Sequence, residues 1–540
     1  MRNTMKNRGK LSIYRSIPKI SRNFSSTTFL SYKVANKSFR IWNWCMSLVK
    51  QCSNMLQFKV IHAIFITNGL HHNTYAVSKL LEFCALSGSG DLSYASQLFS
   101  QVQSPNIFIY NTLIRAYSSS SKPHFAMHYF TTLLHDNETL LPDNYTFPFV
   151  LIACTNGLLL SEGKKTHCWV VKNSMSFSDF HVQTALIRFY AGCKVLDDAQ
   201  RVFNDIPIID VVQANVLMSG YVRNGLASEA LSVFQSMSAR GIEPDEFCVT
   251  SGLAACSHLG AIEKGEWIHR YVKNKNWLES DVFLGTALVD MYAKCGCINT
   301  AVEVFEVMPK RTTHSWAAMI RGFGVHGFPE KAIDCLDRMQ KEDGLWPDSV
   351  VLLGVLAACT HSGLEKEGQL LLGNMESLYG VIPQHEHFSC MVDLLCRAGK
   401  LDEAINLIRM MPMKPLASVW GALLSGCRIH NNNVTLAELA VKELLLLEEG
   451  NGAEEDSAYV QLSNIYLAAH QSDAARKIRR MIGDKGLKKA PGTSVIEVAG
   501  EVNEFVSGDV SHPYLSQIHS VLDLMSPRKH SIDEIRVNEW

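Results

Sequence analysis

A cysteine recurs at an almost constant interval along this chain, and this long period constrains the fold more than any other feature. Four short segments, VKQC, LIAC, LAAC and LAAC, end at Cys52, Cys154, Cys256 and Cys359, which lie 102, 102 and 103 residues apart. A constant period is the signature of a repeat protein, whose copies stack on one another to bury a continuous core. Such chains usually bind extended ligands along a surface instead of enclosing a single active site.

Each period divides into three pairs of helices. Leu186, Phe189, Tyr190 and Cys193 follow the spacing of one helical face, and the same spacing resumes at Ala199. Glycines separate many of the paired segments, as expected at helix ends. A single pair cannot cover both of its apolar faces, so neighbouring pairs must stack. We therefore predict an all-α fold, a right-handed α-solenoid superhelix of helix-turn-helix repeats.

The first 50 residues differ in charge from the rest of the chain. They hold eleven Lys and Arg and no acid, whereas the remainder holds 40 basic and 52 acidic side chains, a formal net charge of −12. A basic, hydroxyl-rich segment without acids is typical of a leader for organelle import, and we predict one over residues 1–42. Its arginines favour the mitochondrion, with the chloroplast as the alternative. A basic arm that binds nucleic acid is the other interpretation.

The sequence offers neither a membrane span nor a recognisable catalytic centre. No apolar run approaches the ~18 residues that a membrane-spanning helix needs. No C-x-x-C occurs and no His is followed two positions later by Glu, so the zinc-site pattern of nucleobase deaminases is missing. We predict that the chain is not an enzyme and has no metal site, no cofactor and no small-molecule substrate. The fifteen cysteines are expected to be mostly buried and free.

Four segments resemble the pentatricopeptide repeats of plant proteins. They are IYNTLIRAY, GIEPD, TALVDMYAKCG and SCMVDLLCRAGKLDEA, at Ile109–Tyr117, Gly241–Asp245, Thr286–Gly296 and Ser389–Ala404. Their order is that of the class in which P, L and S units alternate. The resemblance extends over roughly residues 43–525 and implies an array of about eleven repeats over residues 43–416.

The segments after the array resemble the E and E+ regions of the same family. They lie at Ala417–His430, Tyr459–Gly492 and Glu501–Leu522. The resemblance implies an E region over residues 417–490, an E+ extension over 491–525 and a tail over 526–540. It identifies the chain with the E/E+ subgroup that has no DYW deaminase domain. Val495 departs from the family pattern, which usually has Trp at that position.

In this family each unit contacts one RNA base through the fifth residue of its first helix and its own last residue, a correspondence close to a code. Aligning the units of this chain gives ten such pairs, of which the last two are Leu353 with His385 and Cys390 with Leu416. The first eight are the predicted recognition pairs. They are Ser78 with Asn106, Asn111 with Asp143, Pro148 with Asp179, Thr184 with Asp210, Asn215 with Asp245, Thr250 with Asp281, Thr286 with Thr312, and Ala317 with Asp348.

The last residue of each pair limits which bases it can bind. An ionised Asp only accepts hydrogen bonds and therefore favours guanine or uracil, whereas Asn also donates and suits adenine or cytosine. The family rule adds that Ser or Thr at the fifth position favours purines and that Asn favours pyrimidines. From Ser78 onward, the predicted target contains A, U, an unassigned base, G, U and weakly G. The pairs from Thr286 onward fit no clear rule.

The second residue of several first helices is expected to lie between neighbouring bases. These residues are Phe108, Val212, Phe247 and Phe283. Stacking of a base on an aromatic side chain contributes ~1–3 kcal/mol. Ordinary packing between adjacent helices is the alternative use of these side chains. The terminal Asp residues also have a structural alternative, because Asp caps the start of a helix.

The favoured hypothesis is an organellar factor that selects the site of C-to-U RNA editing. Its expected partners are single-stranded organellar RNA, together with a DYW-type deaminase in trans and editing accessory proteins that contact the E and E+ regions. An RNA stabilisation, processing or splicing factor is the first alternative. A protein-binding scaffold is the second, and the recognition pairs would have no purpose there.

Overall fold

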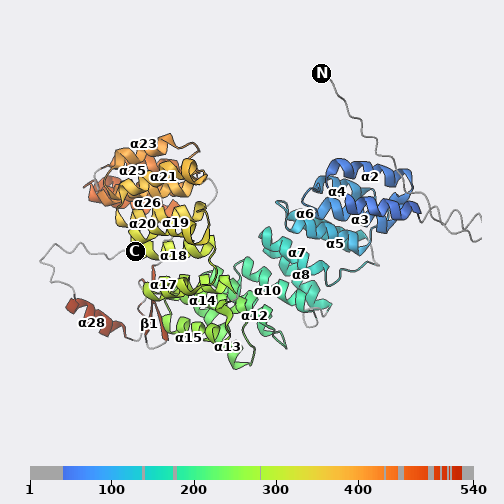
Figure 1. Ribbon diagram of the computed structural model, residues 1–540, viewed down its shortest axis with the longest axis horizontal. Helices are drawn as coiled ribbons and strands as arrows, with labels where there is room; N and C mark the ends of the chain where they lie inside the picture. The colour runs from blue at the N-terminus through green and yellow to red at the C-terminus, as the bar shows by residue number, and fades with distance from the viewer. Residues whose placement is uncertain are drawn as a thin grey trace, which may run out of the picture. The chain divides into compact units, whose positions relative to one another are not determined.

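The structure is a computed structural model that describes residues 40–136, 140–173, 179–279, 281–430, 433–447, 455–484, 492–498, 501–507, 510 and 514–525. The predicted leader, apart from its last three residues, and the predicted tail lie outside the described residues. Contacts between residues divide the chain into two compact units, residues 1–193 and residues 194–540. Each unit is built from antiparallel helical pairs (Figure 1).

The first unit begins with a helix over residues 40–51. It continues with α2 (Met55–Thr67), η1 (Leu70–His72), α3 (Thr74–Leu86), α4 (Leu92–Ser100), α5 (Ile107–Ser118), α6 (His124–Asp136), α7 (Thr146–Asn156), α8 (Leu160–Lys172) and α10 (Phe180–Gly192). The first helix of each pair contacts the first helix of the next, as α3 does with α5, α5 with α7, and α7 with α10. This continuous row is the stacking that the sequence period predicts.

The second unit extends the same pattern. Its helices are α11 (Leu196–Asn204), α12 (Val211–Arg223), α13 (Ala227–Ala239), α14 (Glu246–Leu259), α15 (Ile262–Asn274), η2 (Trp277–Glu279), α16 (Val282–Lys294), α17 (Ile298–Val307), α18 (Thr313–Val325), α19 (Pro329–Asp343), α20 (Ser349–Ser362), α21 (Glu365–Tyr379), α22 (His385–Arg397), α23 (Leu401–Met410), α24 (Ala417–His430), α25 (Val434–Leu447), α26 (Glu455–Ala468) and α27 (Ser472–Asp484). The even-numbered helices from α12 to α26 form the row of first helices, each in contact with the next. The predicted α-solenoid is confirmed.

The recurring cysteines lie in the core between stacked pairs. Cys154, Cys256 and Cys359 are at most 1% exposed and occupy equivalent turns of α7, α14 and α20, whereas Cys52 lies just past the end of the helix over residues 40–51 and is half-buried. All fifteen cysteines are free, and nine are buried. Burial raises the pKa of Cys154 and of Cys256 to about 12, so both thiols are neutral and behave as small apolar side chains.

Glycines repeat with the same period and permit close helix packing. A Cβ atom added at Gly163 would lie 2.0 Å from the Phe189 ring, and one at Gly265 would lie 2.5 Å from the Met291 sulfur. Gly368 stands in the same relation to Leu394, with an added Cβ 2.7 Å from its side chain. In each case the second helix of one pair approaches the first helix of the next too closely for any larger residue.

The C-terminal part of the second unit holds a β-hairpin that the sequence analysis did not anticipate. Strands β1 (Thr493–Val498) and β2 (Glu501–Val506) pair antiparallel, with Val498 opposite Glu501. The hairpin is followed by α28 (Leu515–Met525), in which no residue is buried. The segment TSVIEV is rich in β-branched residues, which is a strand signal, so this hairpin could have been predicted.

Candidate nucleic-acid interface

The predicted recognition residues occupy two places in every helical pair. The fifth residue lies in the second turn of a first helix, and the last residue lies just before the next first helix. Each of the eight last residues accepts hydrogen bonds from backbone N–H groups at the start of that helix; these residues are Asn106, Asp143, Asp179, Asp210, Asp245, Asp281, Thr312 and Asp348. The structural alternative, helix capping, is therefore a real role of these side chains.

Capping uses only one oxygen of several of these carboxylates. Oδ1 of Asp281 accepts from the N–H of Phe283 at 2.7 Å, and Oδ1 of Asp348 accepts from Val351 at 2.9 Å. Oδ1 of Asp245 caps α14 in the same way, at 2.8 Å from the Cys248 nitrogen. The second oxygen, Oδ2, takes no part in these capping bonds. Capping and base recognition can therefore occur on the same side chain at the same time.

Asn111 and Asp143 form the one pair whose two members contact each other directly in the described structure. The Asn111 amide nitrogen donates to Asp143 Oδ1 at 3.0 Å. The hydroxyl of Thr146 lies 2.7 Å from Asn111 Oδ1 and 2.9 Å from Asp143 Oδ1. Asp143 Oδ1 thus serves the cap and the pair together, while Oδ2 makes none of these bonds. The pair is preorganised, with its orientation set before any ligand binds.

The threonine pairs are arranged differently. The hydroxyls of Thr184, Thr250 and Thr286 each donate to the carbonyl four residues earlier, at 2.8 Å in all three cases. Because a hydroxyl has one hydrogen, each oxygen is left with acceptor capacity only. Thr286 also lies 2.7 Å from the buried Ser315 hydroxyl, which in turn lies 3.2 Å from Thr312.

Three predicted recognition residues offer little to a ligand. Ser78 is only 4% exposed and donates its hydroxyl to the Tyr75 carbonyl at 2.7 Å. Ala317 is 3% exposed and Pro148 is half-buried, and neither side chain has a polar atom. Asp179, the partner of Pro148, uses both carboxylate oxygens within the protein, one for the α10 cap and one for Asn144. We leave the pairs of Ser78, Pro148 and Ala317 out of the proposal below.

The second residues of the first helices are exposed, which argues against the ordinary packing alternative. Phe247 is 70% exposed and Phe283 is 79% exposed, and Phe108 and Val212 are 44% and 40% exposed. A buried apolar side chain stabilises the fold, whereas a ring left in water does not, so these rings are available to a ligand. Tyr75, Tyr145 and Val350 occupy the same position and are equally exposed, although the sequence analysis did not name them.

Lys79 strengthens one part of this row. Its ammonium lies 6.0 Å from the centre of the Tyr75 ring and 5.6 Å from that of Phe108, so it links two successive second-position rings. A cation on an aromatic face is attracted by the ring quadrupole. The ammonium also forms an ion pair with Glu82 at 2.6 Å, so its charge is already balanced within the protein.

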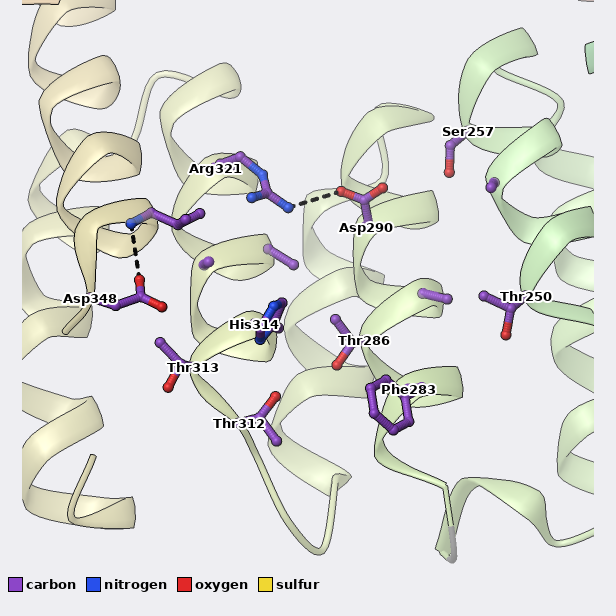
Figure 2. Close-up of a pocket in the computed structure, with 15 residues that line it drawn as sticks. Thr250, Ser257, Phe283, Thr286, Asp290, Thr312, Thr313, His314, Arg321 and Asp348 are labelled. Carbon is purple, nitrogen blue, oxygen red and sulfur yellow. Dashed lines mark hydrogen bonds and ion pairs between the residues drawn. The ribbon is translucent and has the colours of Figure 1, made fainter. Parts of the chain in front are cut away.

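In the second unit, the first helices α14, α16, α18 and α20 line a groove of about 340 Å³ (Figure 2). Phe283 and His314, both at second positions, lie at one side of it, with the fifth residues Thr250 and Thr286 beside them. Arg321 and Asp290 point toward each other across the other side, 3.7 Å apart. The groove therefore combines the three features that single-stranded nucleic acid needs, which are rings, polar atoms and a cation.

Three arginines of the first helices could offset the acidic net charge, and all three are accessible. Arg321 retains 48% of its side-chain exposure despite its ion pair, and Arg188 and Arg223 are exposed. Among the described residues, His, Cys, Asp and Glu nowhere form a group of three that could hold a metal ion. Within the same residues, no helix combines the length and the apolar character that a membrane crossing requires.

Sequence identity to known proteins shows the family to which the chain belongs. A pentatricopeptide repeat-containing protein of Arabidopsis thaliana is 54% identical over 496 residues, which cover 91% of this chain and 98% of the relative. The chain belongs to the pentatricopeptide repeat family. A second Arabidopsis relative, named as chloroplastic/mitochondrial, is 36% identical over 90% of this chain and 77% of its own length.

Family models locate the repeats and a further motif within this pentatricopeptide repeat protein. Repeat models match residues 108–136, 209–258, 286–312, 314–343 and 379–412. A model described as the E motif matches residues 430–497, which hold α25, α26, α27 and most of β1. The maize pentatricopeptide repeat protein PPR10, solved with an 18-nt psaJ RNA element, is 12% identical over 86% of this chain and 88% of its own, with a TM-score of 0.41. A structural similarity at this level adds no argument to the helical pairing described above.

Proposed function

We propose that this pentatricopeptide repeat protein binds single-stranded RNA with one base at each recognition pair. The observation that carries the proposal is that the two carboxylate oxygens of the terminal aspartates have different roles. In Asp143, Asp245 and Asp281 one oxygen caps the next helix, and the other remains for a ligand. This arrangement recurs in several helical pairs along the row, as expected for a polymer ligand and not for a single small molecule.

The fifth residues give these aspartates different base preferences. Guanine presents two neighbouring donors on its Watson–Crick edge, an N–H and an amino group, whereas uracil presents one N–H between two carbonyls. A threonine whose hydrogen is bonded to its own helix, as at Thr250, offers an acceptor to a base held by the Asp, which matches guanine. Asn111 offers amide hydrogens beside Asp143, which matches uracil. The proposed target therefore has U at Asn111, G at Thr184, U at Asn215 and G at Thr250.

The exposed second-position side chains complete the proposed binding mode. A base held at a recognition pair would lie between the second residues of that unit and the next, such as Phe247 and Phe283. Stacking of this kind adds affinity of ~1–3 kcal/mol per base with little base preference. It would offset the weak phosphate attraction that follows from an acidic chain.

The finer function that we propose is site selection for C-to-U editing in an organelle, by a member of the class with P, L and S units and E and E+ regions. The matched E motif supports the editing role, and the names of two relatives, one chloroplastic/mitochondrial and one chloroplastic, support an organelle. The proposed organisation keeps the leader at residues 1–42, the repeats at 43–416, the E region at 417–490 and the E+ extension at 491–525. The mitochondrion is the proposed compartment.

We assign the deaminase to a second protein that docks on the E and E+ regions. An apolar groove of about 420 Å³ lies among α25, α26 and α27, lined by Val441, Leu446 and Leu462 among others. The β-hairpin and α28 add exposed apolar side chains, including Ile496 and Leu522. Exposed apolar surface of this extent is typical of protein docking sites. Holding the cytidine next to a separate catalyst would make the reaction effectively intramolecular.

Plants that lack the protein provide the test. Both organellar transcriptomes are sequenced from the null line and from lines restored with the wild-type chain, with Asp245→Asn or with Asp205→Asn. Asp205 is an exposed residue at the end of α11, so its variant is a control with the same change of charge. We expect the loss of conversion at one or a few cytidines, restored by the wild-type and Asp205→Asn chains but not by Asp245→Asn. Full conversion of every cytidine in the null line would refute the editing role.

A further inference from the structure

Both fifth-position asparagines of the recognition pairs accept a hydrogen bond, through the side-chain amide oxygen, from a hydroxyl of the following helical pair. The amide oxygen of Asn111 accepts from the Thr146 hydroxyl at 2.7 Å, and that of Asn215 accepts from the Ser251 hydroxyl at 2.9 Å. Both hydroxyls belong to the first helix of the following pair, Thr146 to α7 and Ser251 to α14.

The hydroxyls, together with Asp143 at Asn111, determine the orientation of each amide. At Asn111 the nitrogen donates to Asp143 Oδ1, and turning the amide over would bring two acceptors together at the 3.0 Å that now separates the nitrogen from the carboxylate. At Asn215 the Ser219 hydroxyl lies 3.3 Å from the same amide oxygen that Ser251 contacts. The oxygen is thus satisfied by hydroxyls, and hydrogens of the amide nitrogen remain to donate to a base.

The orientation of the amide decides between uracil and guanine. The terminal Asp accepts from the ring N–H of either base and excludes adenine and cytosine. An amide hydrogen beside the Asp finds a carbonyl on both flanks of the uracil N–H. On guanine it finds a carbonyl on one flank and an amino group, another donor, on the other. An amide turned over would present its oxygen and favour that amino group instead.

We propose that Thr146 and Ser251 are specificity-determining positioning residues, whose hydroxyls hold the amides of Asn111 and Asn215 so that these pairs select uracil over guanine. The inference rests on the proposed RNA-binding function and deepens it, because it adds a third residue to two recognition pairs. It also predicts that the third residue acts on the base of the preceding unit, not on the base of the helix to which it belongs.

Ser251→Ala tests the inference without endangering the fold. Ala has a higher helix propensity than Ser, so α14 should remain intact. Ser232→Ala makes the same chemical change on the exposed face of α13, where Ser232 bonds only to the carbonyl of Ser228 at 3.0 Å, and serves as the control. Binding of the purified full chain is measured with RNAs that differ only at the nucleotide facing Asn215, or only at the nucleotide facing Thr250.

We expect Ser251→Ala to lower the uracil-to-guanine affinity ratio at the Asn215 nucleotide roughly three- to ten-fold, the value of one hydrogen bond. The uracil-to-cytosine ratio there depends on Asp245 and should not change. The ratios at the Thr250 nucleotide should not change either, and Ser251→Thr should restore the lost preference. An unchanged uracil-to-guanine ratio, or an equal loss of affinity for all four bases, would overturn the inference.

Thr146 gives an independent second test. Thr146 is fully buried, and Thr146→Val removes its hydroxyl whereas Thr146→Ser retains it. A loss of stability common to both variants can therefore be separated from the loss of the hydrogen bond to Asn111. Only Thr146→Val should lower the uracil-to-guanine ratio at the Asn111 nucleotide. If the wild-type chain itself shows no base preference at either pair, the proposed function and this inference both fail. If the wild-type chain prefers uracil over guanine and both Ser251→Ala and Thr146→Val retain that preference, only this inference fails.

Discussion

The helical repeats and the C-terminal extension, which we define as residues 492–525, expose different kinds of side chain. In the repeats, large apolar residues such as Trp316 are fully buried, and the exposed groups along the first helices are rings and polar atoms at a regular spacing. In the extension, α28 has no buried residue, and Leu524 and Met525 are 86% and 74% exposed. A regular polar surface suits a polymer ligand, whereas a continuous apolar surface suits a folded partner.

Strand β1 of the extension packs against α14 of the repeats, and one described hydrogen bond joins β1 to α15. The carboxylate of Glu497 in β1 accepts from the backbone N–H of Glu263 at the start of α15, at 3.1 Å. Negative charge at a helix N-terminus is favourable, and one contact of this kind typically contributes roughly 0.3–1 kcal/mol. The stability of the repeats should therefore depend only weakly on the extension. The following predictions test that contrast from the largest effect to the smallest.

Removal of Trp316 should damage the repeats severely. Its ring is fully buried against Phe305, lies between Arg311 and Arg338, and donates its N–H to Asp343 at 2.7 Å. Trp316→Ala should lower the free energy of unfolding by roughly 3–5 kcal/mol, as for other buried aromatic side chains. Trp346, which is 59% exposed, gives the matched control. Urea unfolding of both variants measures the difference, and similar losses would contradict the assigned core.

Thiol labelling should distinguish the core of the repeats from their surface. Because burial raises the pKa of Cys154 and Cys256 to about 12, against an ordinary 9.0, each carries roughly a thousandth of the usual thiolate at pH 8. Cys168 is exposed and should react first. Mass spectrometry after brief alkylation gives the order. Early labelling of Cys256 in the native chain would mean that the repeats open locally.

The same shifts predict how stability depends on pH. A thiol whose pKa is higher in the folded state keeps its proton when the unfolded chain has lost it. The contribution of Cys154 and Cys256 is thus fully present below about pH 9 and declines as the pH rises toward 12. Replacing Cys256 with Ser or Ala should flatten this decline in urea unfolding between pH 8 and pH 10.

Exchange of one carboxylate oxygen for an amide should change base preference but not the fold. Asp245→Asn retains a side chain that caps α14, because Asn and Asp cap equally well. It removes an acceptor for the base N–H, so affinity for RNA with uracil at this position should fall roughly 10- to 100-fold. RNA with cytosine there should bind relatively better. Equal affinities of the variant and the wild type for uracil would contradict the role of Oδ2.

A polar substitution in α28 should have the smallest effect on the repeats. Leu522 is 54% exposed, so Leu522→Ser should change the free energy of unfolding by less than about 0.5 kcal/mol and leave RNA affinity unchanged. Under the proposed function the same change should reduce editing in plants. A large loss of stability would show that α28 packs on the repeats and that the contrast between the two regions is wrong.

The repeat architecture and the helix starts could be predicted from the sequence, because both depend on local chemistry. The cysteine period fixed the register, and an Asp ahead of an apolar helical segment indicated each cap, as at Asp210 and Asp281. The exposure of Phe247 and Phe283 required the structure, since an apolar residue in a helix is equally compatible with burial.

The contacts of the recognition residues could not be predicted, because they join helices about 30 residues apart. Thr146 reaches Asn111 across 35 positions, and Ser251 reaches Asn215 across 36. The burial of Ser78 likewise depends on how neighbouring helices stack. The hairpin was a different case, since the alternating β-branched residues around Val495 were visible but were outweighed by the helical pattern before them.

Selection of RNA from a random single-stranded pool by the purified full chain tests the central claim most directly. The account predicts enrichment of a motif in which U, G, U and G face Asn111, Thr184, Asn215 and Thr250 in 5′ to 3′ order, with one unassigned base between the first U and G. Asp245→Asn should alter only the second U of that motif. Recovery of RNA with no common motif, or of a motif that Asp245→Asn leaves unchanged, would contradict recognition of bases by these pairs.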